Sequence, residues 1–357
     1  RFQNKDNYRV AAIIGDGAMT GGLAFEAINN AGHLGRQLTV ILNDNEMSIS
    51  PNVGAISKYF TRLISNPTYN TLKTEAWEIT KKLPLARGTI QAFLSRLDKS
   101  IKNIIVPGML FEEMGFRYFG PIDGHDLDEL LKTLDTIKDI DRPVLLHVIT
   151  KKGKGMSVAE DDPVKYHGVK ANGSLKKDIN KIVVPSFQDV FGHLSCEIAE
   201  NRKDVVCITA AMREGTGLVP FEKKFADRYY DVGIAEGHAV TFSAGLATQG
   251  IRPIVAVYSS FLQRAFDHIV HDVSIQDLPV IFCMDRAGIA GEDGPTHHGS
   301  LDIAYFRCIQ GMVLAAPKNG NEFRHLLYTA LNHSGPFGIR YPKYSSVEFD
   351  ENGQAKL

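Results

Sequence analysis

The sequence predicts an α/β protein of two domains, each built on a mostly parallel sheet flanked by helices. Short apolar runs typical of buried strands alternate along the chain with longer segments of helical periodicity. The length of 357 residues is that of two ordinary domains rather than one. Apolar residues make up 44% and charged residues 23% of the chain, which is the composition of a globular protein.

Charge and cysteine usage argue against several classes of protein. The net charge of −1 argues against a general nucleic-acid binder. No apolar run is long enough to span a bilayer, so no membrane partner is expected. The cysteines lie in apolar surroundings without a CxxC spacing, which predicts buried, unpaired thiols in a reducing compartment. They are Cys196, Cys207, Cys283 and Cys308.

The first domain is expected over residues 1–150. It opens with a strand, a helix and a second strand that form a parallel, right-handed βαβ unit. Residues 53–112 are mixed and basic, and we interpret them as a helical excursion. A capping box at Asp126–Glu129 predicts a later helix start. The predicted strands are 9–14, 38–42 and 144–150, and the predicted helices are 20–32, 72–83, 89–104 and 126–137.

A linker is expected over residues 151–185, which are rich in Lys, Gly and Asp and show no sustained period. The second α/β domain is expected over 186–342, and 343–357 is interpreted as the start of a truncated C-terminal segment. The predicted strands are 205–209, 230–233, 253–258, 279–285 and 312–316, and the predicted helices are 187–201, 236–249, 261–275 and 321–333. Because the chain opens directly on a core strand, we expect the first domain to lack its N-terminal part.

A candidate metal site follows the first two strands. GDGAMTGG (15–22) leaves the first strand, and NDNEM (43–47) ends the second. The carboxyl ends of adjacent parallel strands meet at one sheet edge, about 4.8 Å apart, which would bring Asp16 and Asn45 together. Their oxygens suit Mg²⁺, and backbone amides of residues 15–18 and of the next helix would face phosphate oxygens. The alternative is two ordinary turns with capping Asp and Asn.

The GDG turn, with Asn45 placed 29 positions after Asp16, resembles the thiamine-diphosphate motif of transketolase-like enzymes. Within that superfamily, GDGAMTGGLAFEAINNAG with VILNDNEMSIS is similar to the 1-deoxy-D-xylulose-5-phosphate synthase family. The resemblance continues through ITAAMREGTGL, YSSFLQRAFDHIVHDV, DRAGIAGEDGPTHHG and IRYPK. It implies two transketolase-like thiamine-diphosphate-binding domains, with Mg²⁺ held by Asp16, Asn45 and the carbonyl of Met47. The cofactor-binding residues it implies are Gly15, Asp16, Gly17, Ala18, Met19, Asn45, Met212, Glu236 and Phe261.

The same resemblance makes Glu236 the acid that faces N1′ of the cofactor's aminopyrimidine. Glu236 follows a predicted strand and starts a helix in DVGIAEGHAVT (231–241). A buried acid has a raised pKa, which suits proton exchange near neutral pH. The alternative is an acid that the helix dipole favours at a helix start. Phe261 is implied to stack on the aminopyrimidine, with ordinary core packing as its alternative.

Substrate-binding residues are also implied in the second domain. Arg264 and Arg286 are candidates for the substrate phosphate because a guanidinium matches phosphate oxygens. A solvated helix face for Arg264 and a strand-end salt bridge for Arg286 are the alternatives. The other substrate-binding candidates are Tyr258, Asp293 and Lys343, and the catalytic candidates besides Glu236 are His297 and His167. The alternative for His167 is a solvated linker histidine.

The chain departs from the family pattern in four places. Gly237 stands where the family usually has Gln after the acid. Lys343 replaces the arginine of the family's RYPRG, so a point charge replaces a forked contact. The histidines that the family carries before GDG are absent, as is a C-terminal domain, and we therefore expect a truncated chain.

The resemblance implies a transferase that joins pyruvate to D-glyceraldehyde 3-phosphate, giving 1-deoxy-D-xylulose 5-phosphate and carbon dioxide. This is the first step of non-mevalonate isoprenoid biosynthesis and also serves thiamine biosynthesis. The resemblance further implies thiamine diphosphate and Mg²⁺ as cofactors, a homodimer, and the bacterial cytoplasm, with the plastid left open. Two alternatives remain. One is another enzyme with this cofactor, a transketolase or the decarboxylating subunit of an oxo-acid dehydrogenase, and the other is an inactive truncated paralogue.

Overall fold

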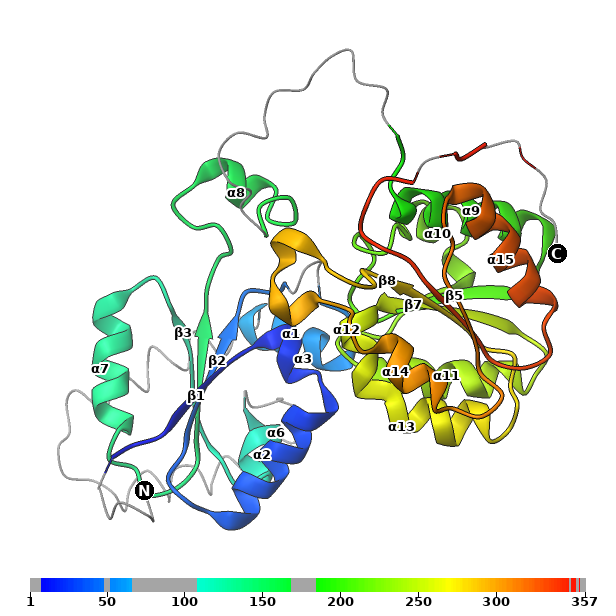
Figure 1. Cartoon of the computed structure of the whole chain (residues 1–357). Coiled ribbons are helices and arrows are strands. Elements are labelled where there is room, and N and C mark those ends of the chain that lie inside the picture. Colours follow the sequence, from blue (N-terminus) through cyan, green and yellow to red (C-terminus); the bar gives the residue numbers. More distant parts are fainter. Residues whose placement is uncertain are drawn as a thin grey trace, which may run out of the picture. The chain divides into compact units, whose positions relative to one another are not determined.

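The computed structural model describes residues 8–47, 52–65, 108–167, 184–346, 348–350 and 353 (Figure 1). The chain divides into two compact units. Unit 1 comprises Arg1–Ser48 with Gly54–Pro163, and unit 2 comprises Ile49–Val53 with Val164–Leu357. Each unit has a parallel sheet flanked by helices, which confirms the predicted fold class.

Unit 1 contains a four-stranded parallel sheet in the order β1-β2-β4-β3. Its strands are β1 (Ala11–Gly15), β2 (Thr39–Asp44), β3 (Arg117–Asp123) and β4 (Val144–Ile149). The predicted pairing of the first two strands is confirmed, with Gly15 opposite Asn43. The prediction missed β3 because Gly120 and Pro121 interrupt it, and proline is tolerated there because β3 is an edge strand.

Helices cover both faces of this sheet (Figure 1). On one face α2 (Gly22–Leu34), α3 (Ala55–Ser65) and α6 (Met109–Glu113) share an apolar cluster with the strands, and on the other α7 (Leu127–Ile137) shares a second. The predicted start of α7 is confirmed, because the Asp126 carboxylate accepts a hydrogen bond from the Glu129 amide at 3.0 Å. The short helix α8 (Ser157–Asp161) follows β4. The predicted helices 72–83 and 89–104 lie outside the described residues.

The predicted helix 20–32 is displaced by two residues. Asp16–Met19 forms a short helix of its own, α1, and Thr20 ends it. Helix α2 therefore begins at Gly22 and continues past Gly32 to Leu34. Gly32 is required for packing rather than for ending the helix, because a Cβ there would lie 1.8 Å from the carbonyl oxygen of Met114. Gly35, at a φ of 59°, is the residue that ends α2.

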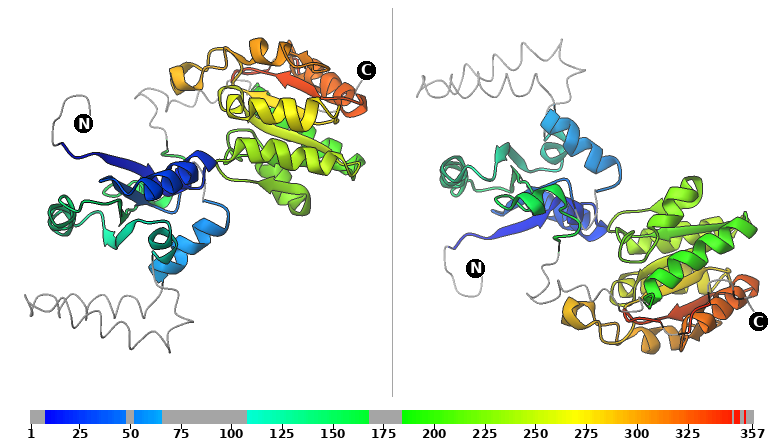
Figure 2. Two further views of the ribbon diagram at one scale, coloured as in Figure 1. Left: turned by 90° about the horizontal axis from the view of Figure 1, so that it is seen from below. Right: turned by 90° about the horizontal axis from the view of Figure 1, so that it is seen from above.

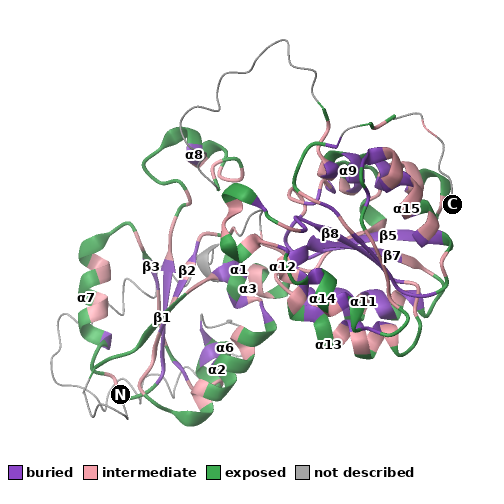
Figure 3. Cartoon of the chain, in the orientation of Figure 1, coloured by how far each residue is buried: buried purple, intermediate pink, exposed green. Residues whose placement is uncertain are grey.

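Unit 2 contains a six-stranded parallel sheet in the order β6-β5-β7-β8-β10-β9, and Figure 2 shows helices on both of its faces. The strands are β5 (Val205–Thr209), β6 (Tyr229–Asp231), β7 (Arg252–Tyr258), β8 (Ile281–Asp285), β9 (Val313–Ala315) and β10 (Phe337–Arg340). The central strands are buried on both sides (Figure 3), as their continuous apolar sequences require. All the predicted strands of this domain are confirmed, and only β10 was missed.

Two helical layers enclose that sheet. The first consists of α9 (Phe187–Asn201), α10 (Val219–Lys224) and α15 (Gly320–Asn332), and the second of α11 (Glu236–Ala247), α12 (Ser259–Leu262), α13 (Phe266–His268) and α14 (Asp302–Arg307). The predicted continuous helix 261–275 is wrong. The segment breaks into α12, a 3₁₀ turn at Gln263–Ala265, α13 and a π-helix at Ile269–Ser274. Apolar periodicity cannot reveal such changes of helical pitch, which are common at functional sites.

The four cysteines are free thiols, as predicted. The predicted burial holds for Cys207 and Cys283, but Cys196 is only half-buried and Cys308 is exposed, so that part of the prediction is wrong for Cys308. Among the helices that the structure describes, none combines the length and the apolar composition needed to cross a membrane.

The contact at Gly32 predicts a large cost for a single methyl group. Gly32→Ala should lower the free energy of unfolding by about 2 kcal/mol, because the backbone at Met114 must move away. The control is Gly22→Ala in the same helix, where the nearest atom to the new Cβ is the Glu26 side chain at 4.0 Å. That variant should be neutral or up to about 1 kcal/mol more stable. Equal denaturation midpoints for the two variants would contradict the packing argument.

Candidate functional site

Two aspartates lie side by side at the carboxyl edge of the unit 1 sheet. Asp16 directly follows β1 and begins α1, and Asp44 is the last residue of β2. Asp16 is 4% exposed and Asp44 is 1% exposed. Burial raises the pKa of Asp16 to about 7, and the charge of Asp44 and a hydrogen bond with it add to the rise. Asp16 is therefore the member of the pair that retains a proton when no cation is present.

Asp44 has the opposite tendency. Burial opposes its ionisation, but the hydrogen bond from His147 and that residue's charge outweigh burial and lower the pKa of Asp44. Oδ2 of Asp44 lies 2.9 Å from Nε2 of His147, and Oδ1 accepts the amide of Glu46 at 3.2 Å. Asp44 is thus the ionised carboxylate of the pair, fixed by two donors.

The other two predicted Mg²⁺ ligands lie at the same edge. Asn45 and Met47 follow β2 immediately, and the amide of Met47 donates to Oδ1 of Asn45 at 3.1 Å. Glu46 between them has a φ of 58°, which turns the chain sharply. Carboxylate, amide and carbonyl oxygens at one edge form a donor set that suits a hard divalent cation. The residues present therefore fit an Mg²⁺ ion.

The remaining unit 1 candidates belong to the turn into α1. A Cβ at Gly15 would contact nothing within 4 Å, Gly17 is buried and Ala18 is exposed. The side chain of Met19 belongs to the apolar core, so a contact of Met19 with a ligand would come from its backbone. These residues give the turn an open backbone surface at Gly15 and a buried anchor at Met19.

Sequence reasoning missed three residues of this edge. Asp44 lies inside the NDNEM motif beside the predicted ligand Asn45 but was not singled out, and the sheet brings His147 close to Asp44 and Lys152 close to Asp16. Burial lowers the pKa of Lys152, and the charge of Asp16 partly opposes this. A lone histidine in the apolar run VLLHVI (144–149) was the one local signal that could have pointed to His147.

In unit 2, Glu236 is a buried carboxyl at the start of α11. It is 3% exposed, and burial raises its pKa, an effect that its own backbone amide and the charge of Arg264 partly oppose. Nη1 of Arg264 lies 3.0 Å from Oε2 of Glu236, but the contact lacks hydrogen-bond geometry. Among the described residues no hydrogen bond reaches that oxygen, so Oε2 remains available to a ligand atom.

Three aromatic rings of unit 2 form a group. The rings of Tyr258 and Phe261 lie 5.4 Å apart at an interplanar angle of 29°, and His297 meets Phe261 edge-on at 5.1 Å. Met212 contacts this group through the Tyr258 backbone, since its sulfur accepts a hydrogen bond from the amide of Tyr258 at 3.4 Å. Phe261 is half-buried, so it is not fully absorbed into the core.

Charged candidates gather beside Tyr258. The guanidinium of Arg286 lies 3.7 Å from the centre of the Tyr258 ring, and its Nε lies 3.2 Å from Oδ2 of Asp293. Lys343 pairs with the other oxygen of Asp293. Although burial opposes it, these two cations lower the pKa of Asp293. The predicted substrate residues are therefore brought together, except Arg264, which lies against Glu236.

The remaining catalytic candidate is His167. It is exposed near the start of unit 2, and its predicted catalytic role stays a prediction.

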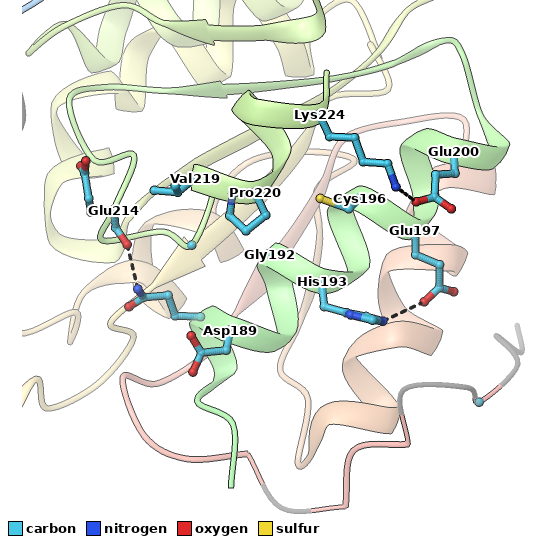
Figure 4. Close-up of a pocket in the computed structure, with 13 residues that line it drawn as sticks. Asp189, Gly192, His193, Cys196, Glu197, Glu200, Glu214, Val219, Pro220 and Lys224 are labelled. Carbon is cyan, nitrogen blue, oxygen red and sulfur yellow. Dashed lines mark hydrogen bonds and ion pairs between the residues drawn. The ribbon is translucent and has the colours of Figure 1, made fainter. Parts of the chain in front are cut away.

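An open cavity of about 980 Å³ lies between α9 and α10 and contains none of the predicted site residues (Figure 4). Its charged side chains pair locally, as in Lys224 with Glu200 and His193 with Glu197.

A buried acid in this region predicts a pH-dependent stability. Burial raises the pKa of Asp285 to about 7 from 3.8, although Arg286 partly opposes the rise. The folded state then keeps a proton that the unfolded chain releases, so stability falls as pH rises from about 4 to about 7. Asp285→Asn should remove roughly 2 kcal/mol of the loss between pH 5 and pH 8, measured by denaturant unfolding.

The exposed Asp227 supplies a control for removal of an aspartate from unit 2. Asp227→Asn should keep the pH dependence of the unaltered chain. An Asp285→Asn protein that loses as much stability between the two pH values as the unaltered chain would contradict the role given to burial.

Comparison with known proteins identifies the relatives of the chain. A family model described as 1-deoxy-D-xylulose-5-phosphate synthase matches residues 1–150, and a model of the transketolase pyrimidine binding domain matches residues 184–346. The 1-deoxy-D-xylulose-5-phosphate synthase of Carboxydothermus hydrogenoformans is 52% identical over 96% of this chain and 55% of the relative. Those of Thermomicrobium roseum and Aquifex aeolicus are each 51% identical over 99% of this chain, covering 55% and 56% of the relative.

The chain thus spans about half the length of these curated relatives. The first family model matches most of unit 1, and the second matches most of unit 2. With this identity over nearly all of its residues, the chain belongs to the 1-deoxy-D-xylulose-5-phosphate synthase family.

Proposed function

We propose that the protein containing this chain condenses pyruvate with D-glyceraldehyde 3-phosphate, giving 1-deoxy-D-xylulose 5-phosphate and carbon dioxide with thiamine diphosphate as cofactor. The observation that carries this proposal is Glu236, a buried acid whose Oε2 accepts no hydrogen bond from the described residues. A carboxyl group kept in this state suits a ligand nitrogen that shares its proton. The names of the relatives support the choice of reaction.

Unit 1 would hold the charged end of the cofactor. Asp16, Asn45 and the carbonyl of Met47 would bind Mg²⁺, which in turn neutralises the diphosphate. The backbone at Gly15 approaches a ligand freely because no side chain stands in the way. Lys152, whose charge interacts with that of Asp16, would add a cation to the same edge.

Unit 2 would hold the aminopyrimidine. When bound, thiamine diphosphate supplies a nucleophilic carbon and takes up the electrons released as pyruvate loses carbon dioxide. Glu236 would hold the proton that it shares with N1′ of the aminopyrimidine, and burial keeps that proton in place near neutral pH. Phe261, which already pairs with other rings, would offer its face to the aminopyrimidine.

The cluster of Tyr258, Arg286, Asp293 and Lys343 would bind the substrate phosphate. Arg286 and Lys343 share Asp293 as their counter-ion, so an arriving phosphate dianion would take over part of this pairing. Arginine contributes a forked contact and lysine a point charge. His297, beside Phe261, would face the reacting groups and exchange protons with them.

The match of residues 1–150 supports this reaction over that of a transketolase or of an oxo-acid dehydrogenase subunit. Retention of Asp16, Asn45 and Glu236 supports activity over an inactive paralogue. A homodimer and a bacterial cytoplasmic location are part of the proposal, since the relatives are bacterial enzymes.

The reaction itself tests the proposed function. The protein, supplied with Mg²⁺ and thiamine diphosphate, should form 1-deoxy-D-xylulose 5-phosphate and carbon dioxide from pyruvate and D-glyceraldehyde 3-phosphate. Asp16→Ala should abolish this activity because the cation loses its carboxylate ligand. Transfer of a ketol group between sugar phosphates, without formation of deoxyxylulose phosphate, would instead identify a transketolase.

A second prediction isolates the proton-sharing acid. Glu236→Gln should bind thiamine diphosphate nearly as well as the unaltered protein but slow exchange of the cofactor's C2 proton with deuterium oxide by about 10²-fold or more. Proton exchange followed by NMR measures this directly. Glu322, an acid in the first turn of α15, supplies the control, and Glu322→Gln should exchange normally. Normal exchange in Glu236→Gln would refute the role given to the acid.

A further inference from the structure

A row of hydrogen-bonded polar side chains crosses the whole sheet of unit 1 near the carboxyl ends of its strands. It begins at Tyr118 on β3, whose hydroxyl lies 2.8 Å from Nδ1 of His147 on β4. Nε2 of His147 lies 2.9 Å from Oδ2 of Asp44 on β2, and Asp44 is hydrogen-bonded to Asp16 after β1. The side chains follow the order of the strands across the sheet, from the β3 edge to the proposed ligand Asp16.

Close packing gives His147 one position. Its side chain is 0% exposed, and the ring of Phe60 lies 5.6 Å from it, centroid to centroid. Tyr118 is held in turn by Gly108, where an added Cβ would lie 2.2 Å from the Tyr118 ring. Gly120 approaches so closely that a Cβ there would lie 2.4 Å from the carbonyl oxygen of His147. The imidazole therefore cannot turn away from Asp44 without moving its neighbours.

The hydrogen bonds at the centre of this row indicate which atoms donate to Asp44. The amide of Glu46 donates to Oδ1 of Asp44, and Nε2 of His147 lies 2.9 Å from Oδ2, where an N–H at Nε2 would donate to it. With Nε2 assigned as a donor, Asp44 is held by His147 on one oxygen and by the amide of Glu46 on the other. The orientation of Asp44 is thus fixed before any ligand arrives.

Such a buried polar pair does little for stability relative to apolar residues of the same size. Its distinctive effect is orientation, as with the outer groups that hold metal ligands in place and whose loss typically costs 10–100-fold in affinity. Asp44 contacts Asp16, and Asp16 is the carboxylate that would bind the cation.

We propose that His147 is a positioning residue for the cation and diphosphate site: by holding Asp44, it fixes the carboxyl group of Asp16 for the incoming ion. This inference rests on the proposed function. Tyr118 supports the same role from one step further away, since its hydroxyl engages the other nitrogen of His147.

The test compares two side chains at position 147 in the full chain. His147→Gln keeps an N–H group near the position of Nε2, whereas His147→Met fills a similar volume without a donor. Isothermal titration with MgCl₂ and thiamine diphosphate should give an affinity about 10–100-fold lower for His147→Met and within about fivefold for His147→Gln. Equal losses in both variants, or an unchanged affinity in His147→Met, would overturn the proposal.

A more conservative variant decides the matter if His147→Met does not fold. Tyr118→Phe keeps the ring and removes only the hydroxyl, so it should lower the affinity by a few-fold in the same direction. An unchanged affinity in that variant, together with an unfolded His147→Met, would overturn the positioning role in favour of a purely structural one.

A spectroscopic readout separates this inference from the proposed function. In the ligand-free protein, ¹⁵N NMR of the imidazole should show hydrogen on Nε2 of His147, and Tyr118→Phe should shift the Nδ1 signal. If the unaltered protein does not bind the magnesium and thiamine diphosphate mixture at all, both proposals fail, even where this signature is present. If the unaltered protein binds and His147→Met binds equally, only the present inference fails.

Discussion

The parallel pairing of β1 with β2 is the constraint on which the site in unit 1 depends. Because Gly15 lies opposite Asn43, both strands end at the same level of the sheet. Asp16 and Asp44 are then forced into contact where water is largely excluded. Two buried carboxyl groups in hydrogen-bond contact cannot both be ionised without a compensating positive charge. The pair must keep a proton or receive a cation, and this electrostatic requirement favours the proposed cation site over an ordinary turn.

Unit 2 also contains a buried acid, Glu236, but the residues around it differ from those around Asp16. Glu236 also opens a helix after a strand, but within the described part of the chain no second carboxylate contributes to its pKa. Arg264 contacts it without forming a hydrogen bond, so the acid is partly compensated electrostatically while one of its oxygens remains available. Both units thus place a buried acid at the start of a helix. The charge beside it differs, because Asp16 has the carboxylate of Asp44 as its neighbour and Glu236 has the guanidinium of Arg264.

Local signals in the sequence predicted the framework and the ligands nearest in sequence to the motif. The alternation of strands and helices, the GDG turn and the position of Asn45 are all encoded within short segments. The motif could not identify Tyr118 and His147, because the contacts from Tyr118 through His147 to Asp44 form only when strands far apart in the sequence pair, His147 lying 103 positions after Asp44. Gly120 and Pro121 concealed β3 for the same reason, since only its place at the edge makes them acceptable.

Binding of a paramagnetic ion tests most directly whether the cation site lies at the edge of the unit 1 sheet. Mn²⁺ in place of Mg²⁺, added with thiamine diphosphate to the deuterated, ¹⁵N-labelled protein, broadens the NMR signals of amides close to it. The NMR signals of the Gly17 and Met47 amides should disappear first. Sharp signals at both residues, with broadening confined to the cavity between α9 and α10, would contradict this location of the cation site.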